Sequence, residues 1–394
     1  MDIVVTAAAG ADTAAVLDEL LEPVAARAVA PDFLVLHPSG HHNVAKVQAA
    51  ANRLSARSIH GATSSRGVMT GRGVRIGEGG IGLFALWDAE GDYGTGRASL
   101  TGEARAAARL ATERALKAAG RQGEAPDLVW LTAVPGCEEE IVAGIEAVVG
   151  PNTPILGGSA ADDTVSGAWA VFDATGVDGD AVVVSVLFPS SPIATAYQSG
   201  YTPTETAGTV TRAEGRVVYE IDGVPAGEVY SHWTGGVVAA PGSEPISILA
   251  ESTFFPLGRA VGTVSDVPLH LLAHPAEMRP DGGIGLFAEV AEGEVLQLMS
   301  GSVDGLTGRA GRVAAQAVHR GNLEPSDVAG ALVIYCGGCM MAVQDHLDRV
   351  ADDVDAALGG APWLGIFTFG EQGTVIDGQN RHGNLMISCA AFAR

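Results

Sequence analysis

The chain has 394 residues, of which 47% are hydrophobic and 18% are charged, so it is long enough to bury a sizeable core and to form two domains. Its formal net charge of −23 at pH 7 argues against nucleic acids and anionic membranes as partners, because phosphate groups are bound by clustered lysine and arginine. Four cysteines do not make a disulfide framework in a chain of this length, no apolar run reaches the roughly 20 residues of a membrane span, and the first residues lack the basic region of a signal peptide. We therefore expect an acidic, cytoplasmic protein with no membrane segment.

The first predicted strand–helix–strand unit lies near the N-terminus. Residues 31–36, Pro-Asp-Phe-Leu-Val-Leu, predict a strand that leads into a loop and a helix. The return strand ends in Gly61-Ala62-Thr63-Ser64-Ser65. Ligands bind beyond the carboxyl ends of strands in open α/β sheets, and small residues there offer backbone N–H groups and hydroxyls. We therefore assign Thr63, Ser64 and Ser65 to a candidate ligand site.

The same unit recurs in the middle of the chain. Residues 126–131, Pro-Asp-Leu-Val-Trp-Leu, match residues 31–36 in pattern. The return strand ends in Gly157-Gly158-Ser159, and Asp163 follows it closely. By the same argument, Gly158, Ser159 and Asp163 join the candidate ligand site.

A repeated peptide indicates an internal duplication. Gly-Gly-Ile-Gly-Leu-Phe-Ala occurs at residues 79–85 and again at residues 282–288, and each copy is followed by Leu-Thr-Gly before a helical pattern. Identical residues in the same order predict two copies of one architecture. We expect an α/β fold (layered α+β) of two pseudo-symmetric modules, each a mixed β-sheet flanked by helices, with domains at residues 1–195 and 196–394.

The C-terminal unit contains the most reactive side chains. An apolar strand over residues 332–335 ends in Cys336-Gly337-Gly338-Cys339, and a helical pattern follows. A second apolar strand then stops at Gly370-Glu371. Cys336, Gly337 and Glu371 therefore lie where strand ends should converge on a ligand.

Overlaying the three units places different chemistry at one position of the fold. The first strands end at His37, Thr132 and Cys336, and the second-strand ends bring Asp163 into the place of Glu371. If both carboxylates face one cleft, their like charges raise the pKa of one of them and create an acid/base pair. The alternative is that each carboxylate caps a following turn or accepts backbone N–H bonds.

Cys336 is the main candidate for covalent chemistry. A cysteine between a strand end and a helix N-terminus has its thiolate stabilised by the helix dipole. With His382 as the base, and Glu371 or Asn384 orienting that imidazole, a Cys/His nucleophile can be written. The alternatives are a buried, inert cysteine, or a Cys336-x-x-Cys339 pair with the spacing of half a metal site or of a redox dithiol.

These segments resemble the FIST family, whose N- and C-terminal modules usually occur together. The resemblance covers nearly the whole chain and rests on residues 60–67, 156–163, 219–226, 336–337 and 365–371.

The chain departs from the family pattern at two places. Where the family often has an arginine shortly after the cysteine, this chain has Gly338-Cys339-Met340. The aromatic-His-Asn segment of the family is Arg381-His382-Gly383-Asn384 here.

The resemblance implies a sensory domain that binds a small ligand. Relatives occur alone, fused to signalling domains, or within F-box ubiquitin-ligase subunits, and some bind haem and sense nitric oxide. For haem, the candidate axial ligands are His37, His41, His42 and His232. If this chain is a sensor, we expect a protein signalling partner to receive its output.

Three hypotheses therefore stand. The first is a sensory protein that binds a small polar or amino-acid-like molecule between its two halves, the second is an enzyme that uses Cys336 as a nucleophile on a small carbonyl substrate, and the third is a haem-based nitric-oxide sensor. No metal site is predicted. In each case the expected cleft is lined by Cys336, Gly337, Glu371, His382 and Asn384, with Thr63, Ser64, Ser65, Gly158, Ser159 and Asp163 contributed by the N-terminal half.

Overall fold

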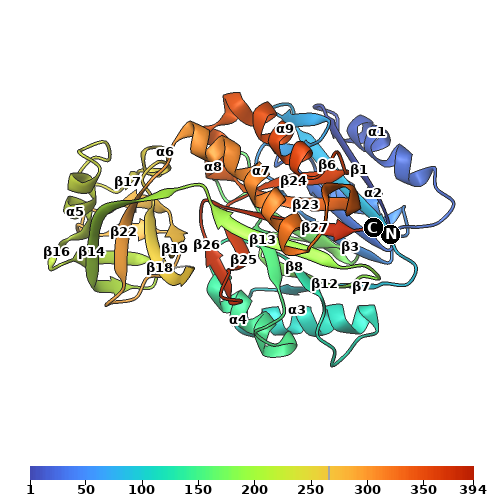
Figure 1. Cartoon of the computed structure of the whole chain (residues 1–394), viewed down its shortest axis with the longest axis horizontal. Helices are drawn as coiled ribbons and strands as arrows, with labels where there is room; N and C mark the ends of the chain where they lie inside the picture. Colours follow the sequence, from blue (N-terminus) through green and yellow to red (C-terminus); the bar gives the residue numbers. More distant parts are fainter. Residues whose placement is uncertain (265–266) are drawn as a thin grey trace.

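A strand–helix–strand unit occurs three times in the computed structural model, which describes residues 1–264 and 267–394 (Figure 1). The first strand of each unit is a buried apolar run that pairs in parallel with the last strand of the same unit, as expected where both faces of a sheet are covered. The first two units are β2 (Phe33–Pro38), α2 (Val44–Asn52), β3 (Ser58–Ala62) and β8 (Leu128–Ala133), α4 (Glu138–Val149), β9 (Ile155–Ser159). The third is β23 (Val328–Cys336), α8 (Gly337–Ala342), α9 (Leu347–Ala357) and β24 (Trp363–Thr368).

Each parallel pair forms the centre of a six-stranded mixed sheet. The first sheet has the order β1-β6-β2-β3-β10-β11, the second β7-β12-β8-β9-β25-β26, and the third β13-β27-β23-β24-β4-β5. The outer strands are β1 (Asp2–Ala9), β4 (Gly67–Thr70), β5 (Gly73–Ile76), β6 (Gly80–Trp87), β7 (Asp92–Ser99), β10 (Val171–Asp173), β11 (Gly176–Asp178), β12 (Ala181–Phe188), β13 (Ile193–Ser199), β25 (Glu371–Thr374), β26 (Asn380–Gly383) and β27 (Met386–Ala393).

The three sheets exchange hairpins in a cycle. The hairpin β4–β5 follows the first unit in sequence but pairs with β24 of the third. The hairpin β10–β11 follows the second unit and pairs with β3 of the first, and β25–β26 follows the third unit and pairs with β9 of the second. Each sheet is therefore completed by chain from another unit.

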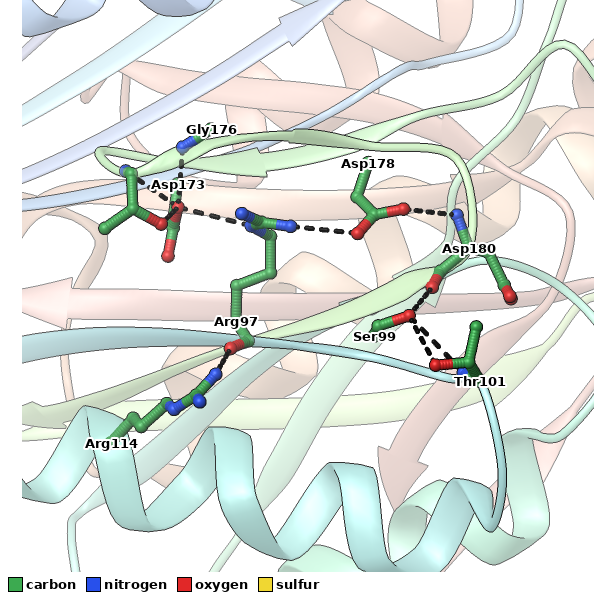
Figure 2. Close-up of polar contacts among 9 residues, drawn as sticks. Arg97, Ser99, Thr101, Arg114, Asp173, Gly176, Asp178 and Asp180 are labelled. Atoms are coloured by element: carbon green, nitrogen blue, oxygen red, sulfur yellow. Dashed lines mark hydrogen bonds and ion pairs between the residues drawn. The ribbon is translucent and has the colours of Figure 1, made fainter.

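Ion pairs fasten one exchanged hairpin to a neighbouring sheet. Arg97 on β7 contacts Asp173 at 3.4 Å and Asp178 at 3.0 Å, so a strand of the second sheet holds both arms of the hairpin β10–β11 (Figure 2). Arg114 of α3 (Ala104–Ala119) donates to the carbonyl of Arg97, which ties the covering helix to the same strand. The hairpin β10–β11 is thus held by ion pairs to β7 as well as by backbone pairing with β3.

Helices cover the outer faces of the sheets. α3 lies close against β7, because Gly94 and Gly96 have no side chains: a Cβ on either would stand 2.1–2.2 Å from a carbonyl oxygen of the helix. α1 (Thr13–Ala25) begins where the Asp12 carboxylate accepts from the backbone N–H of Ala14. α7 (Val303–Arg320) packs on α9 over the third sheet.

A smaller lobe is inserted between β13 and α7, ahead of the third unit, and it is at the left of Figure 1. Its nine-stranded sheet has the order β17-β20-β21-β15-β14-β22-β18-β19, with β16 paired to β15. The elements are β14 (Thr202–Glu214), β15 (Val217–Ile221), β16 (Val224–Pro225), α5 (Ala226–Trp233), β17 (Ile246–Ser247), α6 (Leu249–Ser252), β18 (Leu257–Val264), β19 (Val267–Ala273), β20 (Pro275–Met278), β21 (Ile284–Leu286) and β22 (Val295–Ser300).

The prediction of an α/β fold with mixed sheets flanked by helices is confirmed. The strand–helix–strand unit, faint at the N-terminus in sequence, is complete there in the structure. The repeated heptapeptide falls on β6 in one copy and on β21 of the lobe in the other, and these two strands have unrelated pairing partners. Within the part of the chain that the structure describes, no helix has both the length and the apolar character needed to span a bilayer.

Candidate functional site

A cavity of about 430 Å³ lies between the carboxyl ends of β23 and β24 and the smaller lobe. Its walls are mainly apolar, which follows from the aromatic and aliphatic side chains that reach it from several loops. Trp169 and Phe369 pack edge to face there, with ring centroids 6.3 Å apart. The described lining is Pro135, Glu138, Val165, Trp169, Arg216, Leu249, Ala250, Thr253, Phe254, His274, Phe287, Cys336, Gly338, Met341, Ala342, Phe369 and Asn384.

Cys336 ends β23, is the N-terminal cap of α8, and lines the cavity, as its position in the sequence predicted. Its side chain lies against the carboxyl group of Glu371, which also accepts from the Thr368 hydroxyl at 2.8 Å and the Met386 N–H at 3.0 Å. Burial, and then the neighbouring thiol, raises the pKa of Glu371 well above its usual value. The sequence thus correctly placed this thiol and carboxyl at converging strand ends.

The helix N-terminus does not by itself activate Cys336. The backbone N–H groups of Gly338 and Cys339 favour its thiolate, as the helix-dipole argument expects. The hydrogen bond to the Cys339 thiol and burial outweigh them, and together they raise the pKa of Cys336 well above its usual value. Cys336 is therefore a thiol at neutral pH in this structure.

His382 is not joined to Cys336. On the hairpin β25–β26, Glu371 is opposite Gly383 and Gln372 is opposite His382, so the imidazole and the Glu371 carboxyl point to opposite faces. His382 Nδ1 lies 3.1 Å from Gln372 Nε2, and its Nε2 lies 3.1 Å from the carbonyl oxygen of Phe287. The predicted arrangement of His382 as the base for Cys336 is therefore not made.

Asn384 lines the cavity, and only one end of its side-chain amide is hydrogen-bonded within the described residues. Its Oδ1 accepts from the backbone N–H of His274 at 3.1 Å, which fixes the amide plane and aims Nδ2 away from that contact. Among the residues that the structure describes, this buried Nδ2 has no hydrogen-bond partner. A buried donor without an acceptor costs about 1–3 kcal/mol, so a ligand oxygen at this point would be stabilised.

His274 is a neutral imidazole in the cavity wall. Burial lowers its pKa to about 4. Its Nε2 lies 3.4 Å from the Thr253 hydroxyl, and its ring meets Phe287 edge to face. His274 therefore adds a polar but uncharged group beside Asn384.

The charged end of the cavity is formed by Arg216 and two glutamates at the start of α4. Arg216 Nη2 lies 2.6 Å from a carboxylate oxygen of Glu138 and 2.6 Å from one of Glu139, and Ser159 donates to Glu138 at 2.7 Å. Burial opposes ionisation of Glu138, but His382, Arg216 and these hydrogen bonds hold the pKa of its carboxyl below the usual value. The cavity thus has a fixed guanidinium–carboxylate pair at one end.

Three side chains at the charged end of the cavity are of types that can bind a metal ion. Ligand atoms of Glu138, Glu139 and His382 lie within 4.8 Å of one another. The Arg216 guanidinium already pairs with both carboxylates, and both ring nitrogens of His382 have polar neighbours. We therefore assign no metal here.

The small polar residues of the N-terminal half join the strand ends to one another. Ser64 Oγ donates to the carbonyl of Gly67 at 2.6 Å and accepts from the N–H of Phe367 at 2.9 Å, and Ser65 N–H donates to the carbonyl of Phe367 at 3.0 Å. Ala161 N–H donates to the Thr63 carbonyl, and Phe369 N–H donates to the Ser159 carbonyl. A closed ring of backbone hydrogen bonds therefore links β3, β9 and β24.

The predicted site residues fall into two groups, those that line the cavity and those that are buried outside its lining. Of the predicted residues, Cys336 and Asn384 belong to the described lining of the cavity. Ser159 reaches it indirectly through Glu138, and Gly158 sits beneath Thr368, where a Cβ would be 2.4 Å from the threonine methyl. Apart from Asp163, the remaining predicted positions are buried and outside the described lining: Thr63, Ser64, Ser65, Gly337, Glu371 and His382.

Asp163 and Glu371 occupy different surroundings. Asp163 accepts from the backbone N–H groups of Gly40 (3.2 Å) and Arg66 (2.5 Å), in a loop contact outside the described lining. Glu371 is fully buried beside Cys336. The alternative in which the carboxylate accepts backbone N–H bonds therefore describes Asp163, and its donors come from sequence-distant loops.

Several lining residues were not found from the sequence. Arg216 lies in the turn between β14 and β15, and Glu138 begins α4, so nothing in local sequence relates them. His274 directly follows the lobe strand β19, and no motif in the sequence distinguishes it from other single histidines. The one available signal was Glu138-Glu139-Glu140 at a helix start, a charge pattern that normally marks only a favourable helix dipole.

Comparisons with known proteins place this geometry in a family. The FIST N domain matches residues 32–224, and the FIST C domain matches residues 226–374. The chain belongs to the FIST family. FIST domains are sensory domains of signalling proteins, so a sensory role is the family-level function of this chain.

Other similarities are narrower. An uncharacterized protein of Methanocaldococcus jannaschii is 39% identical over 95 residues, which are 24% of this chain and 18% of that protein. A cyanuric acid hydrolase from A. caulinodans aligns over 100% of this chain and 99% of its own, with 9% identity and a TM-score of 0.39. A chorismatase aligns over 100% and 98%, with 10% identity and a TM-score of 0.36. At these scores neither enzyme's activity carries over to the FIST chain.

Proposed function

We propose that this FIST protein senses a small molecule that binds in the 430 Å³ cavity between the strand ends and the smaller lobe. The observation that carries the proposal is the unpaired Asn384 Nδ2 in a mainly apolar cavity, within the described residues. An apolar wall with one fixed donor is the usual composition of a small-ligand site.

The ligand that these groups suit has an apolar body and a polar head. Trp169, Phe287 and Phe369 offer surfaces for the body, and Asn384 offers a donor to a carbonyl or carboxylate oxygen. Arg216 and Glu138 are complementary to a carboxylate and an ammonium group. An amino-acid-like molecule with an apolar side chain combines these features, and we infer this ligand class.

Binding of L-phenylalanine, measured by isothermal titration calorimetry, tests the proposal. We expect the isosteric variant Asn384→Asp to bind at least tenfold more weakly, because a carboxylate replaces the donor and repels the ligand oxygen. Asn52→Asp, on α2 and outside the described lining, is the matched control and should bind like the wild type. Equal affinity of the Asn384 variant and the wild type would rule out this cavity as the site.

An enzyme that uses Cys336 is the second candidate, and the observation that favours it is the contact of Cys336 with Glu371 at the cavity wall. Against it, burial and the neighbouring thiol raise the pKa of Cys336, and His382 bonds elsewhere. Cys336→Ser separates the two functions: a binding protein keeps its affinity for the ligand, whereas an enzyme loses turnover. We propose binding as the primary function, with a protein partner receiving the signal.

Haem fits the described cavity poorly. The four histidines considered as axial ligands, His37, His41, His42 and His232, are outside its described lining. His274 does line it, but the ring is held between Thr253 and Phe287. We therefore derive no function through haem.

A further inference from the structure

Cys336 and Cys339 form a pair of unequal accessibility. Cys336 is at the N-cap position of α8 and Cys339 follows three residues later in its first turn, so both thiols are on one side of the helix start. Cys336 is 4% exposed and lines the cavity, whereas Cys339 is fully buried behind it. A small molecule in the cavity can therefore reach the Cys336 thiol, and the Cys339 thiol lies next to it on the buried side.

The neighbouring residues leave the Cys336 thiol accessible from the cavity and contact the Cys339 thiol on its buried side. A Cβ on Gly338 would lie 3.7 Å from Cys336 Sγ and 3.6 Å from His274 Cε1, so the absence of a side chain there keeps the approach from the cavity clear. Behind it, the Tyr201 hydroxyl lies 3.6 Å from Cys339 Sγ. The Glu371 carboxyl group lies beside Cys336.

We propose that Cys336 and Cys339 are a dithiol site that reduces a low-molecular-weight disulfide entering the cavity. The Cys336 thiolate attacks one sulfur of R–S–S–R, the S–S bond of the small molecule breaks, and the first RS⁻ leaves. Cys336 gives its proton to water when it becomes the thiolate, and the leaving thiolate takes up a proton from water and departs as RSH. Cys339 then attacks the mixed disulfide on Cys336, releases the second RSH with its own proton, and closes a Cys336–Cys339 disulfide. Two electrons pass from the dithiol to the small disulfide, and two RSH are formed.

The chemistry has a characteristic pH dependence. The neighbouring Cys339 and burial raise the pKa of Cys336, so Cys336 is stored as a thiol at neutral pH. Only the thiolate attacks a disulfide, so the rate should rise steadily from pH 7 to pH 9. This activity rests on the cavity but not on the sensed ligand, so the failure of either proposal leaves the other intact.

The test is the reaction of the full-length reduced protein with 2-hydroxyethyl disulfide, followed by mass spectrometry after alkylation of the remaining thiols. Every protein carries Cys137→Ser, which removes the exposed thiol. We expect the parent to form an internal Cys336–Cys339 disulfide at least tenfold faster than Cys389 reacts. Cys339→Ser should accumulate a mixed disulfide at Cys336, and Cys336→Ser should leave Cys339 unreacted.

Cys389→Ser is the matched control, because Cys389 is equally buried on β27 and belongs to neither the cavity lining nor the pair. It should react like the parent. A mixed disulfide that fails to form in folded Cys339→Ser protein, with far-UV circular dichroism like that of the parent, would overturn the proposal. Equal rates at Cys336 and Cys389 would overturn it as well.

Discussion

Buried histidines in this protein are held neutral by their surroundings. Burial lowers the pKa of His37 to about 3 and of His274 to about 4, and it lowers the pKa of His60 well below its usual value. His60 lies between the Ser185 and Thr132 hydroxyls, at 2.8 and 2.9 Å, which suits a neutral ring with one donor and one acceptor nitrogen. Each such imidazole gains protons more easily when the chain unfolds.

His274 should therefore make the fold sensitive to acid. Its pKa rises from about 4 in the folded chain to the ordinary 6.5 on unfolding, so its contribution is complete above pH 6.5 and is lost as the pH falls toward 4. The full loss is about 3 kcal/mol. We expect the folding free energy of His274→Gln, measured by urea denaturation at pH 7 and pH 4.5, to fall less with acidification than that of the wild type.

The exposed His41 gives the control for this measurement. His41→Gln should follow the wild-type pH dependence, since an exposed imidazole has similar surroundings in the folded and unfolded chains. An identical pH dependence in His274→Gln and the wild type would contradict the assignment of His274 as a buried neutral group.

At the scale of elements, an ion pair is among the polar contacts that join the smaller lobe to the three-sheet body. Arg216, in the turn between β14 and β15, reaches Glu138 and Glu139 at the start of α4, and Glu139 also accepts from the N–H of Glu289. The Glu138 side chain is 3% exposed, so its charge has little access to water. Removing the guanidinium would leave the buried Glu138 carboxylate and the half-buried Glu139 carboxylate without their ion-pair partner.

Arg216→Met should cost about 3–5 kcal/mol of unfolding free energy, as is typical when one partner of a buried ion pair is removed. Arg212→Met is the matched control from the same hairpin, because its pair with Glu220 is exposed and should contribute at most about 1 kcal/mol. Chemical denaturation of both variants makes the comparison. Adding Glu138→Gln to Arg216→Met should recover part of the loss, and equal losses in the two arginine variants would contradict this account.

Elements and strand ends could be predicted from the sequence, but their partners could not. Apolar runs and glycine-rich ends identified β23, β24 and the position of Cys336 correctly. The meeting of Arg216 with Glu138 depends on the packing of a lobe hairpin against α4, and no local pattern encodes that contact. Likewise, the face on which His382 lies depends on its register with Gln372 across a turn.

At the scale of the whole molecule, the exchanged hairpins make the two family domains interdependent. The N-terminal segment 1–224 contains β4, β5 and β13, whose partners β24 and β27 are in the C-terminal segment. In return, the second sheet of the N-terminal segment takes its outer hairpin, β25–β26, from the C-terminal segment. The boundary between the two domain matches is therefore not a boundary between folding units.

We expect residues 1–224 alone to lack a cooperative thermal transition, because unpaired strands and an incomplete sheet expose backbone and apolar surface. Co-expression with residues 225–394 should restore the transition of the intact chain. Circular dichroism melting of the fragment, the complex and the full chain measures this. A monomeric fragment 1–224 with a sharp transition of its own would show that the exchange is dispensable.

The cyclic exchange also means that the three units have no structural first member. The ends of the chain lie side by side in Figure 1, and two contacts agree: Ala393 pairs with Val328, and a Cβ on the neighbouring Gly330 would lie 2.8 Å from the Ile3 side chain. Joining these ends and opening the chain at the exposed turn of Ala89 and Glu90 would give a circular permutant that starts with the second unit and ends with the first. We therefore expect the same three-sheet architecture to form when the chain starts at the second unit instead of the first.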